Sequence, residues 1–229
     1  MATAAYPWFN ALRGKFVVFD GPDGSGKSTQ LARFHEQAQL HGLTVCEVRE
    51  PGGTHIGEEI RKVLLDAKHE EEAPIDLLCE MMLFMASRAQ LIAQRVRPAI
   101  ARGELVLADR FISSTLAYQG AAGGLPIDDI MAVGKVALGD CWPDLVVVFD
   151  VDEHTARQRM NPLLREQEFD TAHDRMEAKG NTFHRKVRDG YLDQAKRHPE
   201  HYLVIDATAE PETVWARLVD GVSRKVIAV

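Results

Sequence analysis

Short apolar runs alternate along this chain with longer stretches of helical periodicity. Between the runs, apolar residues recur at spacings of three and four, as Leu31, Phe34 and Ala38 do. Five runs have the length and composition of buried strands: Phe16–Phe19, Thr44–Val48, Leu105–Ala108, Leu145–Phe149 and Tyr202–Ile205. This alternation predicts an α/β fold in three layers, a five-stranded parallel sheet with helices on both faces.

Residues that typically begin or end helices lie between the apolar runs and indicate where the helices are. Gly42 ends the first helix near His41, and Pro211 fits the first position of the last one. We expect the helices at about 28–41, 56–64, 74–102, 126–136, 152–160, 183–191 and 211–222. Two polar segments lack a clean period: a charged linker at 68–73 and a stretch at about 161–174 that we interpret as a mobile lid.

Length and composition fit a single domain. The 229 residues suffice for one α/β domain at 14–229, preceded by an N-terminal extension, 1–13, that could dock through Trp8 and Phe9. A net charge of −7 argues against binding to nucleic acid or to a membrane surface. No apolar run approaches the ~20 residues that span a bilayer. Three scattered cysteines, with no disulfide or metal-ligand spacing, favour a reducing, cytoplasmic location.

The strongest motif follows the first predicted strand. Residues 21–28 read GPDGSGKS and fit the phosphate-loop pattern G-x-x-x-x-G-K-[ST]. Glycines let backbone N–H groups approach an anion, and the following helix presents its positive end to the same anion. Lys27 can reach the β- and γ-phosphates of a nucleotide, and the Ser28 hydroxyl can ligate Mg²⁺. The expected nucleotide-binding residues are Gly21, Pro22, Asp23, Gly24, Ser25, Gly26, Lys27, Ser28 and Thr29.

Two further pairs carry candidate chemistry. Asp109 and Arg110 end the third strand, where a carboxylate could hold Mg²⁺ and an arginine could bind a second phosphate; a surface ion pair is the alternative. Phe84 and Arg88 lie four residues apart on one helix face, which suits a flat heterocycle, although Phe84 could equally be a core residue. The loops 21–28, 49–54 and 109–119 should meet at the carboxyl ends of the strands.

Four motifs together resemble the thymidylate kinase family. They are the phosphate loop, Arg49-Glu-Pro-Gly-Gly-Thr, Phe84-x-x-x-Arg88-x-Gln90, and Asp109-Arg110-Phe111-x-x-Ser114-Thr115-x-Ala-Tyr118-Gln119-Gly120. The similarity runs from about Gly14 to Val222. It implies a P-loop NTPase fold and transfer of the γ-phosphoryl group of ATP to dTMP, giving dTDP, with Mg²⁺ as cofactor.

The resemblance also implies roles for individual residues. Asp23 would face the sugar of the acceptor near its 3′-hydroxyl, and Arg49 and Arg110 would hold the acceptor phosphate. Phe84 would stack on thymine, and Arg88 would hydrogen-bond its O4 edge. Ser114, Thr115 and Gln119 would line the base pocket, with Tyr118 against the deoxyribose, while Asp109 and Ser28 would organise Mg²⁺ and Lys27 would bind the donor.

Within the family, the catalytic arginine stands either in the phosphate loop or in the lid. Gly24 occupies the loop position here, so the chain resembles the bacterial type that uses a lid arginine, either Arg159 or Arg165. The resemblance further implies a homodimer to which the helix at 74–102 contributes.

Two alternatives remain at this stage. One is a kinase of another pyrimidine nucleotide or of a deoxynucleoside, although Arg49 and Arg110 favour an acceptor that already carries a phosphate. The other is a non-catalytic nucleotide-binding switch. A GTPase-like switch should carry an Asn-Lys-x-Asp motif, which this sequence lacks.

Overall fold

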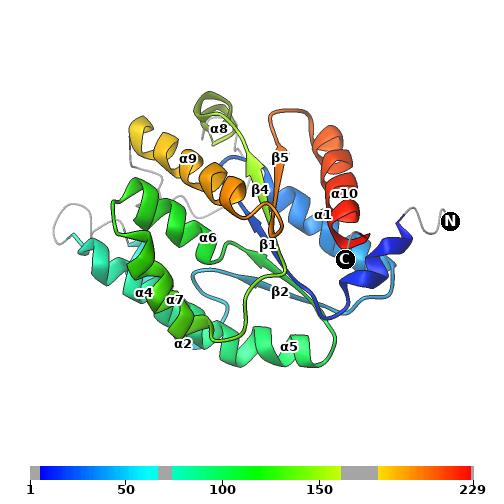
Figure 1. Ribbon diagram of the computed structural model, residues 1–229, viewed down its shortest axis with the longest axis horizontal. Coiled ribbons are helices and arrows are strands. Elements are labelled where there is room, and N and C mark those ends of the chain that lie inside the picture. The colour runs from blue at the N-terminus through cyan, green and yellow to red at the C-terminus, as the bar shows by residue number, and fades with distance from the viewer. Residues whose placement is uncertain (1–5, 67–73, 161–179, 228–229) are drawn as a thin grey trace.

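A five-stranded parallel sheet forms the centre of the computed structural model, which describes residues 6–66, 74–160 and 180–227 (Figure 1). The order across the sheet is β2-β3-β1-β4-β5, and each neighbouring pair is parallel. The strands are β1 (Phe16–Asp20), β2 (Val45–Arg49), β3 (Leu105–Asp109), β4 (Leu145–Asp150) and β5 (Tyr202–Asp206). The predicted parallel sheet is confirmed, and every predicted strand is present within a residue of its expected ends.

Helices cover both faces of the sheet. On one face α1 (Lys27–Leu40) and α10 (Pro211–Ile227) contribute to the core, and on the other face α4 (Leu77–Leu91), α7 (Ile127–Leu138) and α9 (Asn181–Arg197) do so. The remaining helical segments are α2 (His55–Leu65), α5 (Arg97–Ala101), α6 (Ile112–Thr115), α8 (Glu153–Met160), and the shorter or wider turns η1 (Pro7–Leu12), η2 (Ile92–Val96) and η3 (Leu116–Ala122).

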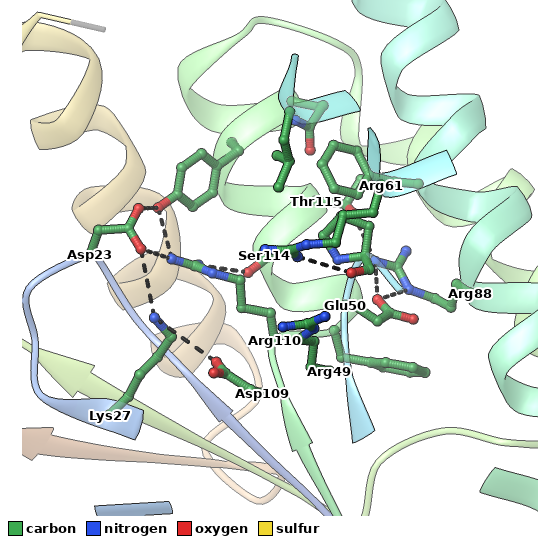
Figure 2. A pocket seen from close by; sticks show the side chains of 16 residues that line it. Asp23, Lys27, Arg49, Glu50, Arg61, Arg88, Asp109, Arg110, Ser114 and Thr115 are labelled. Carbon is green, nitrogen blue, oxygen red and sulfur yellow. Dashed lines mark hydrogen bonds and ion pairs between the residues drawn. The ribbon is translucent and has the colours of Figure 1, made fainter. Parts of the chain in front are cut away.

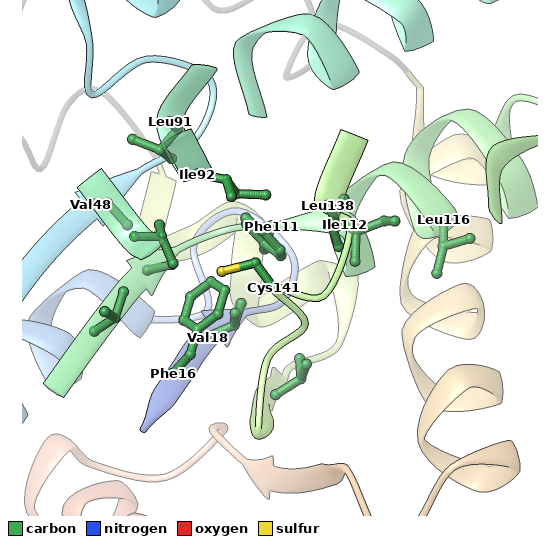
Figure 3. Packing of buried hydrophobic residues seen from close by; sticks show 14 of the residues in the cluster. Phe16, Val18, Val48, Leu91, Ile92, Phe111, Ile112, Leu116, Leu138 and Cys141 are labelled. Atoms are coloured by element: carbon green, nitrogen blue, oxygen red, sulfur yellow. The ribbon is translucent and has the colours of Figure 1, made fainter. Parts of the chain in front are cut away.

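The strands divide their side chains between two apolar cores because successive residues point to opposite faces. Phe16 and Val18 of β1 join one core, shown in Figure 3 with Val48, Leu91 and other residues packed around Phe111. Val17 and Phe19 join the other core. Four of the five β1 residues are apolar and fully buried, as expected for a central strand covered on both sides.

Two expectations need correction. The helix predicted at 74–102 begins at Leu77 and contains the π-helical segment η2, so it is not one regular α-helix. The segment 109–119, which we expected to be a loop, folds after Arg110 into α6 and then the π-helix η3. Its periodicity is obscured because a π-turn carries an extra residue, which shifts the face that each following side chain occupies.

The described part of the predicted N-terminal extension, from Tyr6 onward, docks through Trp8 and Phe9 as expected. Phe9 of η1 is fully buried, and its ring lies 4.9 Å from that of Phe34 on α1. The ring of Trp8 stacks on Phe9 at 4.4 Å. The charged linker at 68–73 and the lid predicted at 161–174 lie outside the described residues. None of the described helices combines the length and the apolar composition that a bilayer crossing needs.

Strand register brings the three predicted ligand segments together. Asp109 at the end of β3 pairs with Phe19 of β1 on one side and with Arg49 of β2 on the other. The carboxyl ends of these strands therefore deliver the phosphate loop, the segment after Arg49 and the segment after Asp109 to one edge of the sheet.

Candidate active site

The phosphate loop connects β1 to α1 and requires glycine at its first position. Gly21 has φ of 137°, and a Cβ there would lie 2.5 Å from the carbonyl oxygen of Phe149 on β4. Gly26, with φ of 82°, is the residue before the first turn of α1. The chain can therefore turn tightly enough to place several N–H groups and the positive end of α1 around one anion.

Lys27 lies between two carboxylates. Its Nζ is 3.6 Å from Asp23 Oδ1 and 3.9 Å from Asp109 Oδ1. The Ser28 hydroxyl donates to Asp109 Oδ2 at 3.4 Å. Asp109 Oδ1 is buried and accepts no hydrogen bond from the described residues. Two adjacent oxygen donors, one of them anionic, fit the preference of Mg²⁺ for hard oxygen ligands, so these residues could hold the metal.

Arg110 adopts an unusual backbone conformation that places it in the site. Its φ of 67° is the only positive value at a non-glycine position among the described residues. This conformation costs about 1–2 kcal/mol for an L-residue. In return, the side chain turns toward the phosphate loop, where its guanidinium pairs with Asp23 and lies 3.1 Å from Ser114 Oγ. Strain of this kind, held by surrounding contacts, is typical of functional positions.

A buried carboxylate that the sequence analysis missed organises these contacts. Asp20, fully buried at the end of β1, accepts hydrogen bonds from Ser113 at 2.6 Å, Ser114 at 2.7 Å and Tyr191 at 2.6 Å. Its Oδ1 also lies 3.5 Å from Arg110 Nη1. The signal available in the sequence was an aspartate that ends an otherwise apolar strand.

The charge state of Asp23 follows from its neighbours. Burial alone would raise the pKa of Asp23, but the charges of Arg110 and Lys27 and a hydrogen bond from the Tyr118 hydroxyl hold it well below its usual range. The Tyr118 hydroxyl donates to Asp23 Oδ2 at 3.0 Å. Burial in turn raises the pKa of Tyr118 far above its usual value. Asp23 is therefore an anion, and Tyr118 a neutral donor, throughout the physiological range.

A second arginine is buried at the other end of the site. Arg88, 1% exposed, donates from Nε to Glu50 Oε2 at 2.7 Å and from Nη2 to Thr115 Oγ1 at 3.1 Å. Burial raises the pKa of Glu50 to about 7, although the charge of Arg88 acts in the opposite direction. Glu50 was not predicted as a site residue; its position directly after Arg49 in a polar turn gave no sign of burial.

A cavity of about 240 Å³ lies between the two arginines. Figure 2 shows Asp23, Lys27 and Asp109 at one end, Arg88 and Glu50 at the other, and Arg110, Arg49 and Ser114 between them. Besides those, the cavity is lined by Pro51, Arg61, Leu65, Phe84, Phe111, Thr115, Tyr118 and Gln119. All nine residues predicted for the acceptor, from Asp23 to Gln119, therefore lie around one space, and Arg61 is a cation that sequence reasoning missed.

A second cavity, of about 500 Å³, lies on the other side of the phosphate loop. It is lined by Arg159, by residues of the β5–α10 segment, and by the predicted nucleotide-binding residues Gly24, Ser25, Gly26, Lys27, Ser28 and Thr29. The guanidinium of Arg159 donates to the carbonyls of Ala207, Thr208 and Ala209 at 2.8, 3.1 and 3.3 Å. Arg165, the other candidate arginine, lies outside the described residues.

Lys27 lines both cavities, so this residue lies between the two spaces. The first space ends in a cluster of arginines and an aromatic ring, and the second opens onto the phosphate loop. Two anionic ligands that each placed a charged end at Lys27 would bring those ends next to one another. This is the arrangement that transfer of a phosphoryl group between two nucleotides requires.

Comparison with known proteins agrees with this geometry. A family model described as thymidylate kinase matches residues 19–218. The chain belongs to the thymidylate kinase family. It is 43% identical over 212 residues to the thymidylate kinase of Desulforudis audaxviator, covering 90% of this chain and 91% of that protein. It is 41% identical over 213 residues to the thymidylate kinase of Deinococcus radiodurans, covering 93% and 98%.

A solved structure shows the same fold. The chain superposes on the crystal structure of thymidylate kinase from Ehrlichia chaffeensis with a TM-score of 0.70, at 29% identity, covering 91% of this chain and 97% of the other. The expected P-loop NTPase fold is thereby confirmed. Membership in the thymidylate kinase family makes the chain an enzyme. The alternative of a non-catalytic nucleotide-binding switch is therefore not favoured.

Proposed function

We propose that this member of the thymidylate kinase family binds ATP in the cavity beside Arg159 and dTMP in the cavity beside Arg88, so that the γ-phosphoryl group passes to the dTMP phosphate beside Lys27. Phosphorylation of dTMP to dTDP, with ATP as donor, is the activity of the family. The observation that carries the placement of the two nucleotides is the position of Lys27 in the wall of both cavities.

The acceptor end would neutralise the phosphate of dTMP. Arg110 reaches into the cavity from β3, and Arg49 from the end of β2, where its side chain is 56% exposed and its guanidinium lies 3.3 Å from Glu58. An arginine fork can pair with two phosphate oxygens at once. With Lys27, these groups would offset the repulsion between two anionic substrates.

The base end would bind thymine between an aromatic face and polar edges. Phe84 is half-buried and lines the cavity next to Arg88, which suits stacking of the base on the ring. Arg88 would donate to O4 of the base. Ser114, Thr115 and Gln119 complete the lining, and Tyr118 would lie against the deoxyribose near Asp23.

The donor end would use the phosphate loop and Arg159. The loop amides and Lys27 would hold the β- and γ-phosphates, and Ser28 with Asp109 would bind Mg²⁺, which would neutralise phosphate charge when bound. Arg159 was predicted as a possible catalytic arginine. Its fixed position against the carbonyls of the β5–α10 segment instead supports a role in holding the donor, with its planar guanidinium against the base of ATP.

The mechanism that follows is one of positioning and charge neutralisation. The attacking phosphate oxygen of dTMP is already anionic, so no strong general base is needed. The chain's contribution is to align that oxygen with the γ-phosphorus and to stabilise the charge that develops between them. Arg110 would act on the acceptor side and Lys27 on both sides.

We also propose that two copies associate in a reducing, cytoplasmic compartment. Exposed apolar side chains gather on two adjacent helices, with Ile56 and Val63 on α2 and Leu78 and Met82 on α4. Such residues are typical of a surface covered by a partner. The three cysteines are unpaired, as expected under reducing conditions.

A coupled assay of ADP release tests the proposed activity. The purified chain is given ATP, Mg²⁺ and one of the acceptors dTMP, dUMP, UMP or CMP. We expect the highest kcat/KM with dTMP. ATP hydrolysis that no acceptor accelerates, or a preference for CMP, would contradict the placement of thymine at Arg88.

A further inference from the structure

Gln119 is fixed by a buried carboxylate that the mechanism above does not use. Its Nε2 donates to Glu80 Oε1 at 2.8 Å, and the two residues are 2% and 1% exposed. Gln119 belongs to η3, and Glu80 belongs to the first turn of α4. The bond therefore joins two elements 39 positions apart in the chain, immediately behind the cavity that Gln119 lines.

The chemistry of the pair decides which way the amide faces. A carboxylate accepts hydrogen bonds and donates none, so Gln119 must turn its amino group toward Glu80. The negative charge of Glu80 is favoured by the positive end of α4, in whose first turn it lies. The amide oxygen, Oε1, is then directed away from Glu80, and among the described residues no donor contacts it.

Arg88 and Gln119 together present a donor and an acceptor to the cavity. A guanidinium can only donate, whereas the Oε1 of Gln119, held in this orientation, can only accept. Thymine and uracil carry the complementary pair, a carbonyl at C4 and an N–H at N3. Cytosine carries the reverse pair, an amino group at C4 and an unprotonated N3. It would therefore place a donor against the Arg88 guanidinium and an acceptor against Gln119 Oε1.

We propose that Glu80 is a positioning residue that sets the polarity of the Gln119 amide, and thereby selects thymine or uracil nucleotides over cytosine nucleotides. This inference rests on the proposed placement of the pyrimidine beside Arg88. Without the charge at position 80, the amide can rotate by half a turn with little change in shape. Its amino group would then face the cavity and match N3 of cytosine.

The experiment compares dUMP with dCMP, which differ only at C4 and in the proton at N3. kcat/KM for both acceptors is measured for the wild-type chain, Glu80→Gln, Gln119→Leu and the double variant. We expect Glu80→Gln to lower the ratio of dUMP to dCMP at least tenfold, about 1.4 kcal/mol, while KM for ATP is unchanged. In the Gln119→Leu background, Glu80→Gln should have no further effect on the ratio.

A swap variant distinguishes orientation from general damage. In Glu80→Gln/Gln119→Glu, the amide at position 80 donates to a carboxylate at position 119, whose second oxygen still accepts from N3–H. The swap should recover the preference for dUMP that Glu80→Gln loses. It also supplies the test if Glu80→Gln alone does not fold, since a folded swap variant that shows no preference for dUMP would overturn the proposal.

Other results have defined meanings. An unchanged ratio in Glu80→Gln, or an equal loss with and without Gln119, would overturn the role of Glu80 and leave the proposed function intact. If the wild-type chain phosphorylates neither dTMP nor dUMP, it is the proposed function that fails.

Discussion

At the scale of single residues, two arginines that pair with carboxylates lie at opposite ends of the cavity, Arg88 buried and Arg110 with a side chain 18% exposed. Arg110 is held by Asp23 and Asp20 at the phosphate end, whereas Arg88 pairs with Glu50 at the base end, where the two side chains are 1% and 3% exposed. Burying an ion pair costs desolvation that the attraction between the charges repays only in part. We infer that both pairs serve to position a guanidinium rather than to stabilise the fold.

Lys27 lines both cavities, and we propose that it binds the phosphates of both substrates. We expect Lys27→Ala to lower kcat at least ~100-fold, because it removes a fixed positive charge from the transferring group. The measurement is ADP release with saturating ATP and dTMP. Lys15→Ala is the matched control, since Lys15 pairs with Asp144 at 3.0 Å, has a side chain that is 44% exposed, and lines neither cavity. Near-normal turnover of Lys27→Ala would remove the phosphate loop from the mechanism.

Glu50 should make stability depend on pH. Its pKa is about 7 in the folded chain, because of burial, against 4.5 as the ordinary value. The folded state therefore binds more protons between these two values, and the free energy of unfolding falls as pH rises through this window. From pH 5 to pH 8 this contribution amounts to about 2 kcal/mol.

Urea unfolding at pH 5 and pH 8 measures this effect. We expect the wild-type chain to lose about 2 kcal/mol more than Glu50→Gln over this interval, since the amide does not titrate. The difference between the two proteins isolates Glu50 from the other carboxylates. An equal loss in both would show that Glu50 does not titrate in this range.

At the scale of elements, the π-helix η3 and helix α9 shape the cavity beside Arg88 that we propose for dTMP, the acceptor cavity, as distinct from the donor cavity beside Arg159 that we propose for ATP. The extra residue in a π-turn changes the direction of the side chains that follow. In η3, the adjacent residues Tyr118 and Gln119 contact Asp23, which lines the cavity, and Glu80, which lies behind it. Helix α9 packs against η3 and contributes Tyr191, whose hydroxyl lies 2.8 Å from Ser114 Oγ.

Tyr191 of α9 should affect dTMP binding because its hydroxyl helps to position Arg110. In Tyr191→Phe, Asp20 loses the hydrogen bond of 2.6 Å and Arg110 Nη1 loses an acceptor at 3.2 Å, so the guanidinium is held less firmly. We expect KM for dTMP to rise several-fold with KM for ATP unchanged. Tyr202→Phe is the matched control, because its hydroxyl bonds Gln194 away from both cavities. Equal effects of the two variants would contradict a positioning role for Tyr191.

Arg159 should affect the binding of ATP, the other substrate. Since it lines only the donor cavity of the two, we expect Arg159→Ala to raise KM for ATP about tenfold while KM for dTMP changes little. Arg157→Ala, an exposed arginine on the same helix, is the control. A tenfold loss of kcat with KM for ATP unchanged would instead support the catalytic role that the sequence suggested.

At the scale of the whole molecule, the active site and the apolar surface lie near one another. Helix α2 carries Arg61, which lines the acceptor cavity, and also the exposed residues Ile56 and Val63. Helix α4 carries Phe84 and Arg88 of the cavity as well as the exposed Met82. A partner on this surface would therefore support the helices that form one wall of the proposed dTMP site.

The oligomeric state tests this surface. We expect the wild-type chain to be a dimer and Met82→Lys to shift it toward a monomer. Met82 is 49% exposed in the single chain, and dimerisation would bury the lysine ammonium there without an opposite charge to pair with. Light scattering coupled to gel filtration gives the mass of each species. Leu40→Lys, a 71% exposed position at the end of α1, is the control. A wild-type chain that is monomeric at micromolar concentration would contradict the proposed dimer.

The sequence alone determined the strands, most of the helices and the phosphate loop, because each depends on local pattern: apolar periodicity, glycine where φ is positive, and fixed motif spacing. Its resemblance to a family also pointed to nine residues that the cavity brings together, although not to Glu50 or Arg61. Local pattern could not reveal Asp20, Glu50, Glu80 or Tyr191, since their roles depend on partners 38 or more positions away.

Only the tertiary structure decided how those groups meet. Parallel pairing aligns the carboxyl ends of β1, β2 and β3, and the positive φ of Arg110 and the π-turn of η3 then direct side chains into one space. Burial follows from that packing, and burial raises the pKa of Glu50. The chain's residues specify the chemistry available, whereas their distances and solvent exposure, which set charge and orientation, arise only when distant segments pack together.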